Sequence, residues 1–545
     1  MAMFVAGACA LLALRVLLAF RLPVNSDEPQ HLHVAWAWLH GYVPYRDVFD
    51  NHAPLFQMLF SPLLALIGER ADIVPLARLA MIPLYMAALG LTFAIGRTLF
   101  SSRVGITAAL IATAAPVFMQ VSVEYRPDQL WMVLWLAAIA VGVSALPARQ
   151  KYALAGLIVG AAFATSLKTV LLAAASGGAA IAVAWLAGWP RAAMSRRDVA
   201  LFAAFALLVP GIVVVYLVHV GAAQAALYCL FSHNVDAGLG HWRHAEWRLL
   251  ALLGCPAAML VTRNLLRPQA TRVALLRCLA MLTTAFYMSA LYAFWPLVTH
   301  QDLLPMLPIV YVGIAAIVHP PEPAVSRGRL VDSLGPATAA IAVGALCVAN
   351  LASVLLLDAD AMNGQQAQLR RILQLTRPGD PVMDGKGLAI FRARPTYWAL
   401  EGITEQRLRD RTIADDIPER LAATSTPLVV ADRLPVEDRR FVDRNYFCVG
   451  DGLYIAGQRM HANSGVTRTF RVEIPQTYAL VAARGDSQAR IDGIDAQAPV
   501  FLAAGPHTLD VAGDDIVWLV WSAALQRGLS RADIVGGDMQ HADCT

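Results

Sequence analysis

The stretch that decides the fold class is TVLLAAASGGAAIAVAWLA, residues 169–187. It has no charged side chain and is close to the roughly 20 apolar residues that a helix needs to cross a bilayer. Similar runs occupy most of the first 357 residues and predict an all-α polytopic membrane bundle of about eleven helices. The expected spans are 3–22, 74–96, 104–121, 129–146, 152–167, 169–187, 199–219, 247–262, 273–293, 303–318 and 335–357.

The composition agrees with a membrane protein. The 545 residues are 58% hydrophobic and 15% charged, with a mean hydropathy of +0.54. A soluble domain carries about 25% charged residues, so an ordinary soluble enzyme and a disordered chain are excluded. The net charge of +4 is too small to indicate nucleic acid as a partner.

Basic residues between the runs indicate sidedness, because cytoplasmic loops of membrane proteins are enriched in lysine and arginine. With a cytoplasmic N-terminus, the eleven expected spans place every basic cluster inside. Segment 53–68 must then not cross, and its short length and two prolines favour an interfacial helix. The clusters are Arg97 and Arg103; Arg149 and Lys151; Arg191, Arg196 and Arg197; Arg263, Arg267, Arg272 and Arg277; and Arg327 and Arg329.

The same parity places the remaining polar regions outside. These are the loop 23–73, the link 122–128, the loop 220–246, the link 294–302 and the tail 358–545. We therefore expect domain 1–357 to be the membrane bundle, with interfacial helices in the loop 23–73.

The tail has a different composition from the bundle. Residues 365–376 have the pattern of a short amphipathic helix and TPLVVADR, 426–433, that of a buried strand, which predicts an extracytoplasmic α/β domain over 358–460. Alternating strands with Gly and Asp turns predict a β-rich, sandwich-like domain over 461–545. Trp518 and Trp521 lie in such a strand and are expected in its core.

The cysteines do not suggest a metal site. The chain has seven, with no C-x-x-C pair, and five of them lie in apolar stretches. Cys448 and Cys544 lie in the polar tail, where an extracytoplasmic location would permit a disulfide between them.

Acidic residues follow the first expected span directly. Asp27 and Glu28 lie at a membrane boundary, where desolvation raises the pKa of a carboxyl group toward that of a working base. The alternative is that both residues cap a helix beginning at Pro29, and the sequence alone favours this alternative.

Histidines and tryptophans follow the two acids. The stripe is typical of an aromatic belt at the membrane interface. A metal site built from His31, His33 and His40 is disfavoured, because residues two apart do not share a helix face.

Three further extracytoplasmic regions carry charged or hydrogen-bonding groups. Link 122–128 contains Glu124, Arg126 and Asp128, where Asp128 could equally cap the next helix and Arg126 pair with Glu124. Arg243 in the loop 220–246 and His300 in the link 294–302 are of a type that binds phosphate. The alternative is that they are solvated loop residues.

Six segments of the first 320 residues stand in an order typical of one known family. They are SDEPQHLHVAWAWLHGYVPYRD (26–47), HAPLFQMLFSPLLALIGE (52–69), ARLAMIPLYMAALGLTFAIGRTLF (77–100), APVFMQVSVEYRPDQLW (115–131), AGLIVGAAFATSLKT (155–169) and HQDLLPMLPIVY (300–311). Together they resemble the GT-C superfamily of integral-membrane glycosyltransferases, and within it the protein O-mannosyltransferases and lipid A aminoarabinose transferases.

The resemblance implies roles for individual residues. The family's first-loop acid corresponds to Asp27, with Glu28 beside it, and its second-loop acid to Asp128. The family's lysine after the fifth span corresponds to Lys168. Where the family often has a lysine beside prolines, this chain has Asn-His-Ala-Pro at 51–54, so His52 is the candidate replacement for the missing cation.

The implied reaction moves a sugar from a polyprenyl-phosphate donor to a hydroxyl of a glycan, lipid or protein acceptor. Asp27 would take the acceptor's proton, and attack in line would invert the anomeric centre. The expected location is the bacterial inner membrane, among membrane lipid, with the site on its extracytoplasmic side. The candidate donors to the phosphate are Lys168, Arg126, His52, Arg243 and His300.

Several alternatives stay open. No cofactor is certain, and a divalent cation (magnesium or manganese) held by Asp27 and Asp128 is one alternative. A transporter or flippase of a lipid-linked substrate is another, although the expected pairs of broken spans are not found. An O-antigen ligase or polymerase would also use a lipid carrier, but it would lack the early Asp-Glu pair. A non-catalytic scaffold is the third, in which Asp27 would be replaceable.

Overall fold

The computed structural model describes residues 2–187, 195–235, 271–295, 298–319, 359–463, 465–483 and 488–539, with short pieces of 253–263 and 344–356. These residues form two compact units. The helical unit comprises Met1–Pro23, Asn51–Leu59 and Pro75–Ala359. The mixed unit comprises Val24–Asp50, Phe60–Val74 and Asp360–Thr545, so the first polar loop groups with the tail.

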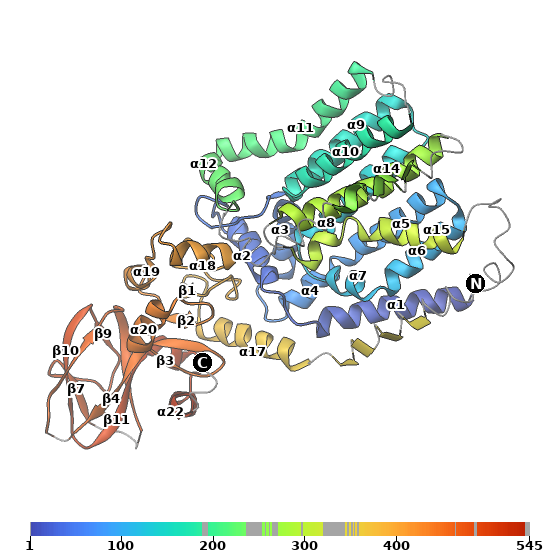
Figure 1. Ribbon diagram of the computed structural model, residues 1–545. Coiled ribbons are helices and arrows are strands. Elements are labelled where there is room, and N and C mark those ends of the chain that lie inside the picture. Colours follow the sequence, from blue (N-terminus) through green and yellow to red (C-terminus); the bar gives the residue numbers. More distant parts are fainter. Residues whose placement is uncertain are drawn as a thin grey trace. The chain divides into compact units, whose positions relative to one another are not determined.

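Helices make up the first unit, in which α9 packs against α8 and α11, and α10 packs against α14 (Figure 1). Helices α3 (Leu55–Ile67) and α4 (Ile73–Leu79) each run from one unit into the other. The remaining helices are α1 (Ala2–Arg21), α5 (Ile82–Leu99), α6 (Ser102–Ala114), α7 (Pro116–Val121), α8 (Pro127–Val143), α9 (Ala148–Thr165), α10 (Thr169–Ala187), α11 (Arg196–His219), α12 (Ala223–Leu227), η1 (Tyr228–Ser232), α14 (Arg272–Phe294), η2 (His300–Leu303) and α15 (Leu307–Val318).

Two of the expected spans are interrupted. Run 74–96 is divided between α4 and α5, and run 104–121 between α6 and α7. The second break lies at Ala115, whose extended backbone is the conformation favoured before a proline, and Pro116 then starts α7.

Four helices in the described part of the chain are long and apolar enough to cross a membrane. They are Ile73–Leu99, Thr169–Ala187, Arg196–His219 and Arg272–Phe294. Segment 55–67 forms a shorter apolar helix, α3, and the expected runs 247–262 and 335–357 fall mostly outside the described residues. The expected total of about eleven spans therefore stays a prediction.

Small residues allow close packing of α9 against α11. A Cβ at Gly156 would lie 2.3 Å from Phe202 O, and a Cβ at Gly160 would lie 2.3 Å from Ala206 O. Two glycines four residues apart thus bring the two backbones together, as in small-residue helix contacts within membranes.

The mixed unit combines helices with two sheets. Its helices are α2 (Asp27–Leu39), α17 (Ala359–Leu375), α18 (Gly402–Arg409), α19 (Ile417–Ala423), α20 (Val436–Asn445), α21 (Ser522–Gln526) and α22 (Arg531–Met539). Its strands are β1 (Val382–Met383), β2 (Leu428–Val430), β3 (Tyr446–Cys448), β4 (Leu453–Ala462), β5 (Arg468–Val472), β6 (Gln476–Ala482), β7 (Ala489–Ile491), β8 (Ile494–Asp495), β9 (Val500–Leu502), β10 (Gly505–Val511) and β11 (Asp515–Trp521).

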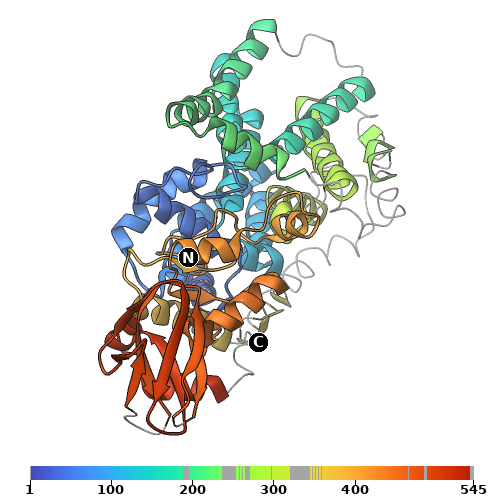
Figure 2. The same cartoon turned by 90° about the vertical axis from the view of Figure 1, so that its left-hand side faces the viewer.

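One sheet of seven strands runs in the order β1-β2-β4-β11-β6-β9, with β3 also paired to β4, and only β1 and β2 are parallel. A second sheet has the order β5-β10-β7-β8. The expected division of the tail at about residue 460 falls within β4, so the larger sheet crosses it. Figure 2 shows these strands from a second direction.

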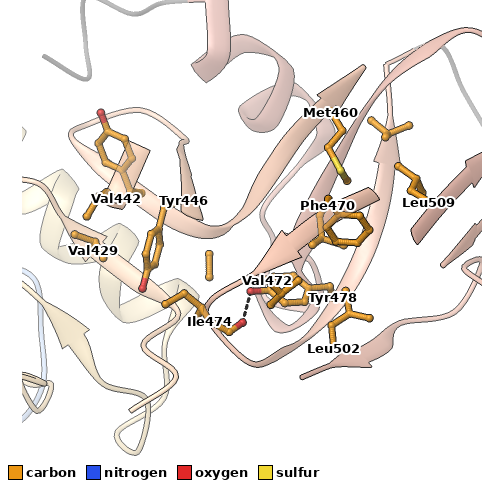
Figure 3. Close-up of a cluster of buried hydrophobic side chains, with 14 of the residues drawn as sticks. Val429, Val442, Tyr446, Met460, Phe470, Val472, Ile474, Tyr478, Leu502 and Leu509 are labelled. Atoms are coloured by element: carbon orange, nitrogen blue, oxygen red, sulfur yellow. Dashed lines mark hydrogen bonds between the residues drawn. The ribbon is translucent and has the colours of Figure 1, made fainter. Parts of the chain in front are cut away.

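One hydrophobic core serves both parts of the tail. Val429 and Val442 belong to the same buried cluster as Phe470, Tyr478 and Leu509 (Figure 3). The Tyr478 hydroxyl donates to Ile474 O at 2.7 Å, which satisfies its one polar atom inside this core.

Other expectations for the tail are tested directly. Trp518 and Trp521 are buried, as expected from the alternating pattern. The amphipathic helix expected at 365–376 lies within α17, and TPLVVADR contains β2. Cys448 is disulfide-bonded, whereas Cys544 lies outside the described residues, so their pairing stays a prediction.

Candidate functional site

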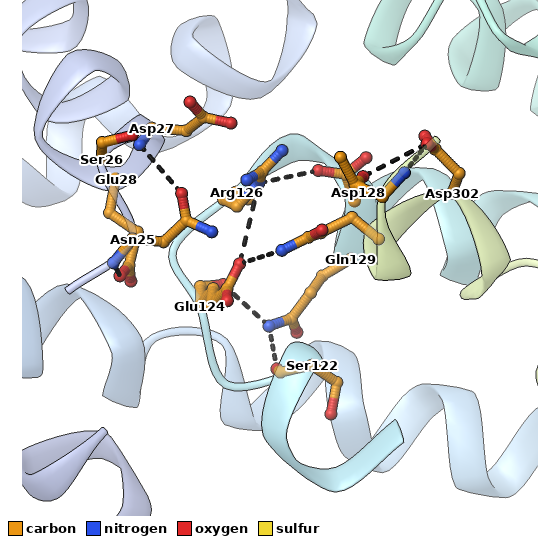
Figure 4. Close-up of polar contacts among 12 residues, drawn as sticks. Asn25, Ser26, Asp27, Glu28, Ser122, Glu124, Arg126, Asp128, Gln129 and Asp302 are labelled. Atoms are coloured by element: carbon orange, nitrogen blue, oxygen red, sulfur yellow. Dashed lines mark hydrogen bonds and ion pairs between the residues drawn. The ribbon is translucent and has the colours of Figure 1, made fainter. Parts of the chain in front are cut away.

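Lys168 lies at the centre of an ionic cluster in the helical unit. It occupies the short turn between α9 and α10, where the sequence predicts a break. Its Nζ contacts the Oδ1 of Asp302 and lies 3.9 Å from the Oδ1 of Asp128. The turn at 166–168 thus meets the links 122–128 and 294–302 (Figure 4).

Arg126 supplies the second cation of this cluster. Its Nε lies 3.1 Å from the Asp128 carboxylate and 3.8 Å from that of Glu124. The Gln301 side-chain amide donates to the Glu124 carboxylate at 2.7 Å. This is a further contact between the links 294–302 and 122–128. The pairing of Arg126 with Glu124 therefore forms, but Arg126 is closer to Asp128.

The link 122–128 is held in place by two buried side chains. Arg15, inside the first expected span, donates to Ser122 Oγ at 2.9 Å and to its carbonyl oxygen. Gln129 donates to the carbonyl oxygens of Ser122 and Glu124. A buried arginine costs several kcal/mol of desolvation unless it is paired, so these bonds stabilise both α1 and the link.

Asp302 is anchored independently of Lys168. Its second carboxylate oxygen accepts the Thr299 backbone N–H at 2.8 Å and the Thr299 hydroxyl at 3.2 Å. The Tyr287 hydroxyl donates to the Asp302 carbonyl at 2.7 Å. Because Asp302 is fully buried and fixed on both sides, it presents one oxygen to the lysine.

The other residues named from sequence have different outcomes. His52 lies close enough to Asp128 to contribute to its electrostatic environment, and Asn51 is joined to the loop 220–246 because Asn234 donates to its carbonyl at 2.9 Å. His300 is exposed, and its neighbour Asp302 is the residue of that link which joins the cluster. Arg243 lies outside the described residues.

In the mixed unit, Asp27 and Glu28 form the first turn of α2. The helix begins at Asp27 rather than at Pro29, and Ser26 precedes it. The capping prediction for the two acids is wrong, because both lie inside the first turn. The Asn25 side chain accepts the Asp27 backbone N–H at 3.1 Å, and the buried Glu28 carboxylate accepts the Asn25 backbone N–H at 3.0 Å. The Asp27 carboxylate instead contacts the ammonium group of Lys386.

Lys386 is a charged partner that the sequence did not indicate. It lies in a loop after β1, roughly 360 residues along the chain from Asp27, and nothing in its local pattern points to α2. Asp27 and Asp128 belong to different units, so their joint action stays a prediction.

His31 and His33 of α2 are buried inside the mixed unit, whereas His40, just after the helix, is exposed. The Nδ1–H of His33 donates to Ile390 O at 3.1 Å, and burial lowers the pKa of His33 to about 4, with Arg394 adding to the effect. His33 is therefore neutral at pH 7. Among the described residues, no group of three His, Cys, Asp or Glu side chains is arranged to hold a metal ion.

Comparison with known proteins gives two kinds of match. Residues 51–216 match the family model described as dolichyl-phosphate-mannose-protein mannosyltransferase. No curated protein matches the sequence significantly.

Two solved structures share the fold. The structure of ArnT from Cupriavidus metallidurans bound to undecaprenyl phosphate has 14% identity and a TM-score of 0.53, covering 79% of this chain and 93% of that chain. ArnT from the same organism in the apo state has 15% identity and a TM-score of 0.54, covering 84% and 97%. Together with the family model, they confirm the resemblance to GT-C glycosyltransferases.

Proposed function

We propose that this chain transfers a sugar from a polyprenyl-phosphate carrier to an acceptor hydroxyl. The observation that carries the proposal is the buried cluster around Lys168, built from links that the hydropathy pattern puts between spans. Its residues 126, 128 and 168 lie within the range matched by the mannosyltransferase model. The fold is shared with a protein whose structure contains undecaprenyl phosphate.

One cation of the cluster can reach a donor phosphate. The cluster combines two cations with the carboxylates of Glu124, Asp128 and Asp302. The side chain of Lys168 is 23% exposed and that of Arg126 only 8%, so Lys168 is the cation that can reach a ligand. Fixed charges in a buried site stabilise developing charge without reorganising.

The reaction itself balances with the residues named. The acceptor oxygen attacks C1 of the sugar, its proton passes to the Asp27 carboxylate, and the bond from C1 to the phosphate oxygen breaks. The products are the glycosylated acceptor and polyprenyl phosphate, and in-line attack inverts C1. Because phosphate is a stable leaving group, the step needs a base and cationic donors rather than an acid.

The finer parts of the proposal concern place and partners. We expect the site on the extracytoplasmic side of a bacterial inner membrane, because the basic clusters lie in the opposite loops. The long apolar bundle suits a donor whose tail stays in the bilayer. The acceptor is a glycan, lipid or protein, and the donor sugar is a hexose or pentose.

A binding experiment tests the donor site without knowledge of the sugar. Undecaprenyl phosphate is the probe, and its binding to the full chain in detergent is measured as a rise in the melting temperature. Lys168→Met should weaken binding about tenfold or more, whereas Arg440→Gln, at an exposed ion pair of α20, should not change it. Equal affinity of Lys168→Met and the parent chain would remove Lys168 from the site.

A transfer assay tests the reaction. The chain is reconstituted in vesicles with a panel of labelled polyprenyl-phosphate sugars and a membrane extract as acceptor source. We expect labelled product with at least one donor, and loss of that product in Lys168→Met. Probe binding without transfer from any donor would favour the flippase alternative, which is then tested by movement of the labelled lipid between leaflets.

A further inference from the structure

Lysine is rare in this chain, although basic residues are not. Only Lys151, Lys168 and Lys386 are lysines among 43 basic residues. Lys386 contacts Asp27, which the sequence singled out. Lys168 contacts Asp302 and lies 3.9 Å from Asp128, which the sequence also singled out. Arginine is the more frequent cation in this chain, and these two lysines each lie against a carboxylate.

Lys386 contacts the start of α2. Its Nζ contacts Asp27 Oδ1 and lies 3.3 Å from Ser26 Oγ. The two charged side chains are largely buried, with 12% of Lys386 and 19% of Asp27 exposed. Solvent therefore screens this pair less than it screens a surface ion pair.

The loop that carries Lys386 is built to hold it there. The buried Asp384 accepts the backbone N–H groups of Gly387 at 2.5 Å and Ala389 at 2.6 Å, and Arg394 contacts it at 3.1 Å. Gly387 has φ +89°, and a Cβ there would lie 3.0 Å from Gln30 Cα. Only glycine suits that conformation and that approach, so the loop is seated directly on α2.

The other charged groups near this pair are accounted for within the mixed unit. Glu28, on the same helix, is turned to the Asn25 N–H. Asp384 and Arg394 are paired with each other. Asp432, which follows β2, adds negative charge near Lys386, and its neighbour Arg433 offsets that charge. Lys386 contacts Asp27 directly.

We propose that Lys386, from the tail, is a positioning residue that holds the Asp27 carboxylate ionised and aimed during transfer. This inference rests on the proposed role of Asp27 as base. An adjacent ammonium group favours the charged carboxylate, which keeps the base ready at lower pH. The tail then belongs to the catalytic machinery rather than serving only as an acceptor guide.

The first test is the pH profile of transfer. Lys386→Met should move the acid limb of kcat/KM upward by about one pH unit, so that transfer at the acid end falls about tenfold while the plateau changes less. Lys386→Arg keeps a positive charge and should keep the parent limb. Arg371→Gln, which removes the ion pair with Asp533 elsewhere in the tail, is the matched control and should leave the profile unchanged.

The second test reads the ion pair without using activity. The intact chain is labelled with an amine-selective reagent at pH 8. The chain is then digested, and the labelling rate of each of the three lysines is measured by mass spectrometry of the peptides. Lys386 should react several-fold faster in Asp27→Asn than in the parent, because a lysine released from its ion pair is more accessible to the reagent. Lys151 is the internal reference. It lies in the helical unit, where it donates to Ser144 O.

The outcomes separate this inference from the proposed function. Full transfer by Asp27→Asn would overturn the base itself. Loss of transfer in Asp27→Asn, together with a parent-like acid limb in Lys386→Met, would overturn only the role of Lys386. Unchanged labelling of Lys386 in Asp27→Asn would overturn the contact on which that role depends.

Discussion

The two lysine sites differ in how many groups hold the cation. Lys168 in the helical unit lies between two carboxylates, one of them anchored by Thr299. Lys386 in the mixed unit has one carboxylate partner and is carried by a glycine-containing loop. The first arrangement has several charges that must all be compensated, so it is rigid. The second centres on the ion pair between Lys386 and Asp27, so its proposed effect is on the charge state of that carboxylate.

The largest expected effect comes from the carboxylate of the second site. Asp27→Asn removes the proposed base and should lower transfer by about 10²–10⁴-fold, because that is the usual contribution of general base catalysis. The labelled-donor assay in vesicles measures it. Asp72→Asn, at an exposed pair with Arg70, is a control that should transfer normally. Comparable rates for both variants would leave Asp27 with only a helix-start role.

Stability should separate the two lysine sites. Lys168→Met leaves the buried Asp302 without its cation and should cost about 3–5 kcal/mol of unfolding free energy. Lys386→Met leaves behind the Asp27 carboxylate, which is 19% exposed and so still reaches solvent, and should cost less, about 1–2 kcal/mol. Thermal unfolding in one detergent gives both values. If Lys386→Met were the more destabilising change, the contrast between a rigid and a tunable site would be wrong.

Displacing the loop 384–389 without replacing a charged residue should have a smaller effect on transfer. Gly387→Ala places a Cβ against Gln30 in a strained backbone conformation, at a cost of about 1–3 kcal/mol, and should displace Lys386 from Asp27. The acid limb of transfer should then move in the same direction as in Lys386→Met. Gly379→Ala has open space and no positive φ, so it should leave the limb unmoved.

The smallest expected effect concerns a buried carboxyl surrounded by acids. Burial, with Asp415, Glu419 and Glu437 nearby, raises the pKa of Asp438 to about 7. The folded state then binds more protons than the unfolded state between about pH 4 and pH 7, so this group's contribution to stability falls as pH rises through that window. Asp438→Asn should raise the melting temperature by about 2–4 °C at pH 8 and change it little at pH 4. An equal rise at both pH values would contradict the assignment.

Much of the helical unit could be predicted from local pattern. Helices α8, α9, α10, α11, α14 and α15 lie where the apolar runs are, and α3 lies where two prolines argued against a span. Within the candidate site, Asp128, Arg126 and Lys168 were predicted and do lie together. Their meeting was predictable because the span parity puts these link residues at one end of the helices.

The missed residues are those whose partners are distant in sequence. Asp302 rather than His300 pairs with Lys168. The two residues lie in the same polar link, and the sequence does not show which of them turns toward the lysine. Arg15 could have been found, because a charged residue inside an apolar run signals a buried partner. Lys386 could not, since neither its loop nor α2 has a local feature that points to the other.

The sequence alone determined the membrane class, the order of the apolar helices and the positions of the polar links, because the length and charge of a run are properties of about 20 neighbouring residues. Only the tertiary structure decided which charge faces which. A buried ion must be matched by groups brought to it from elsewhere in the chain, and the seating of a loop such as 384–389 on α2 depends on backbone contacts that no local pattern encodes.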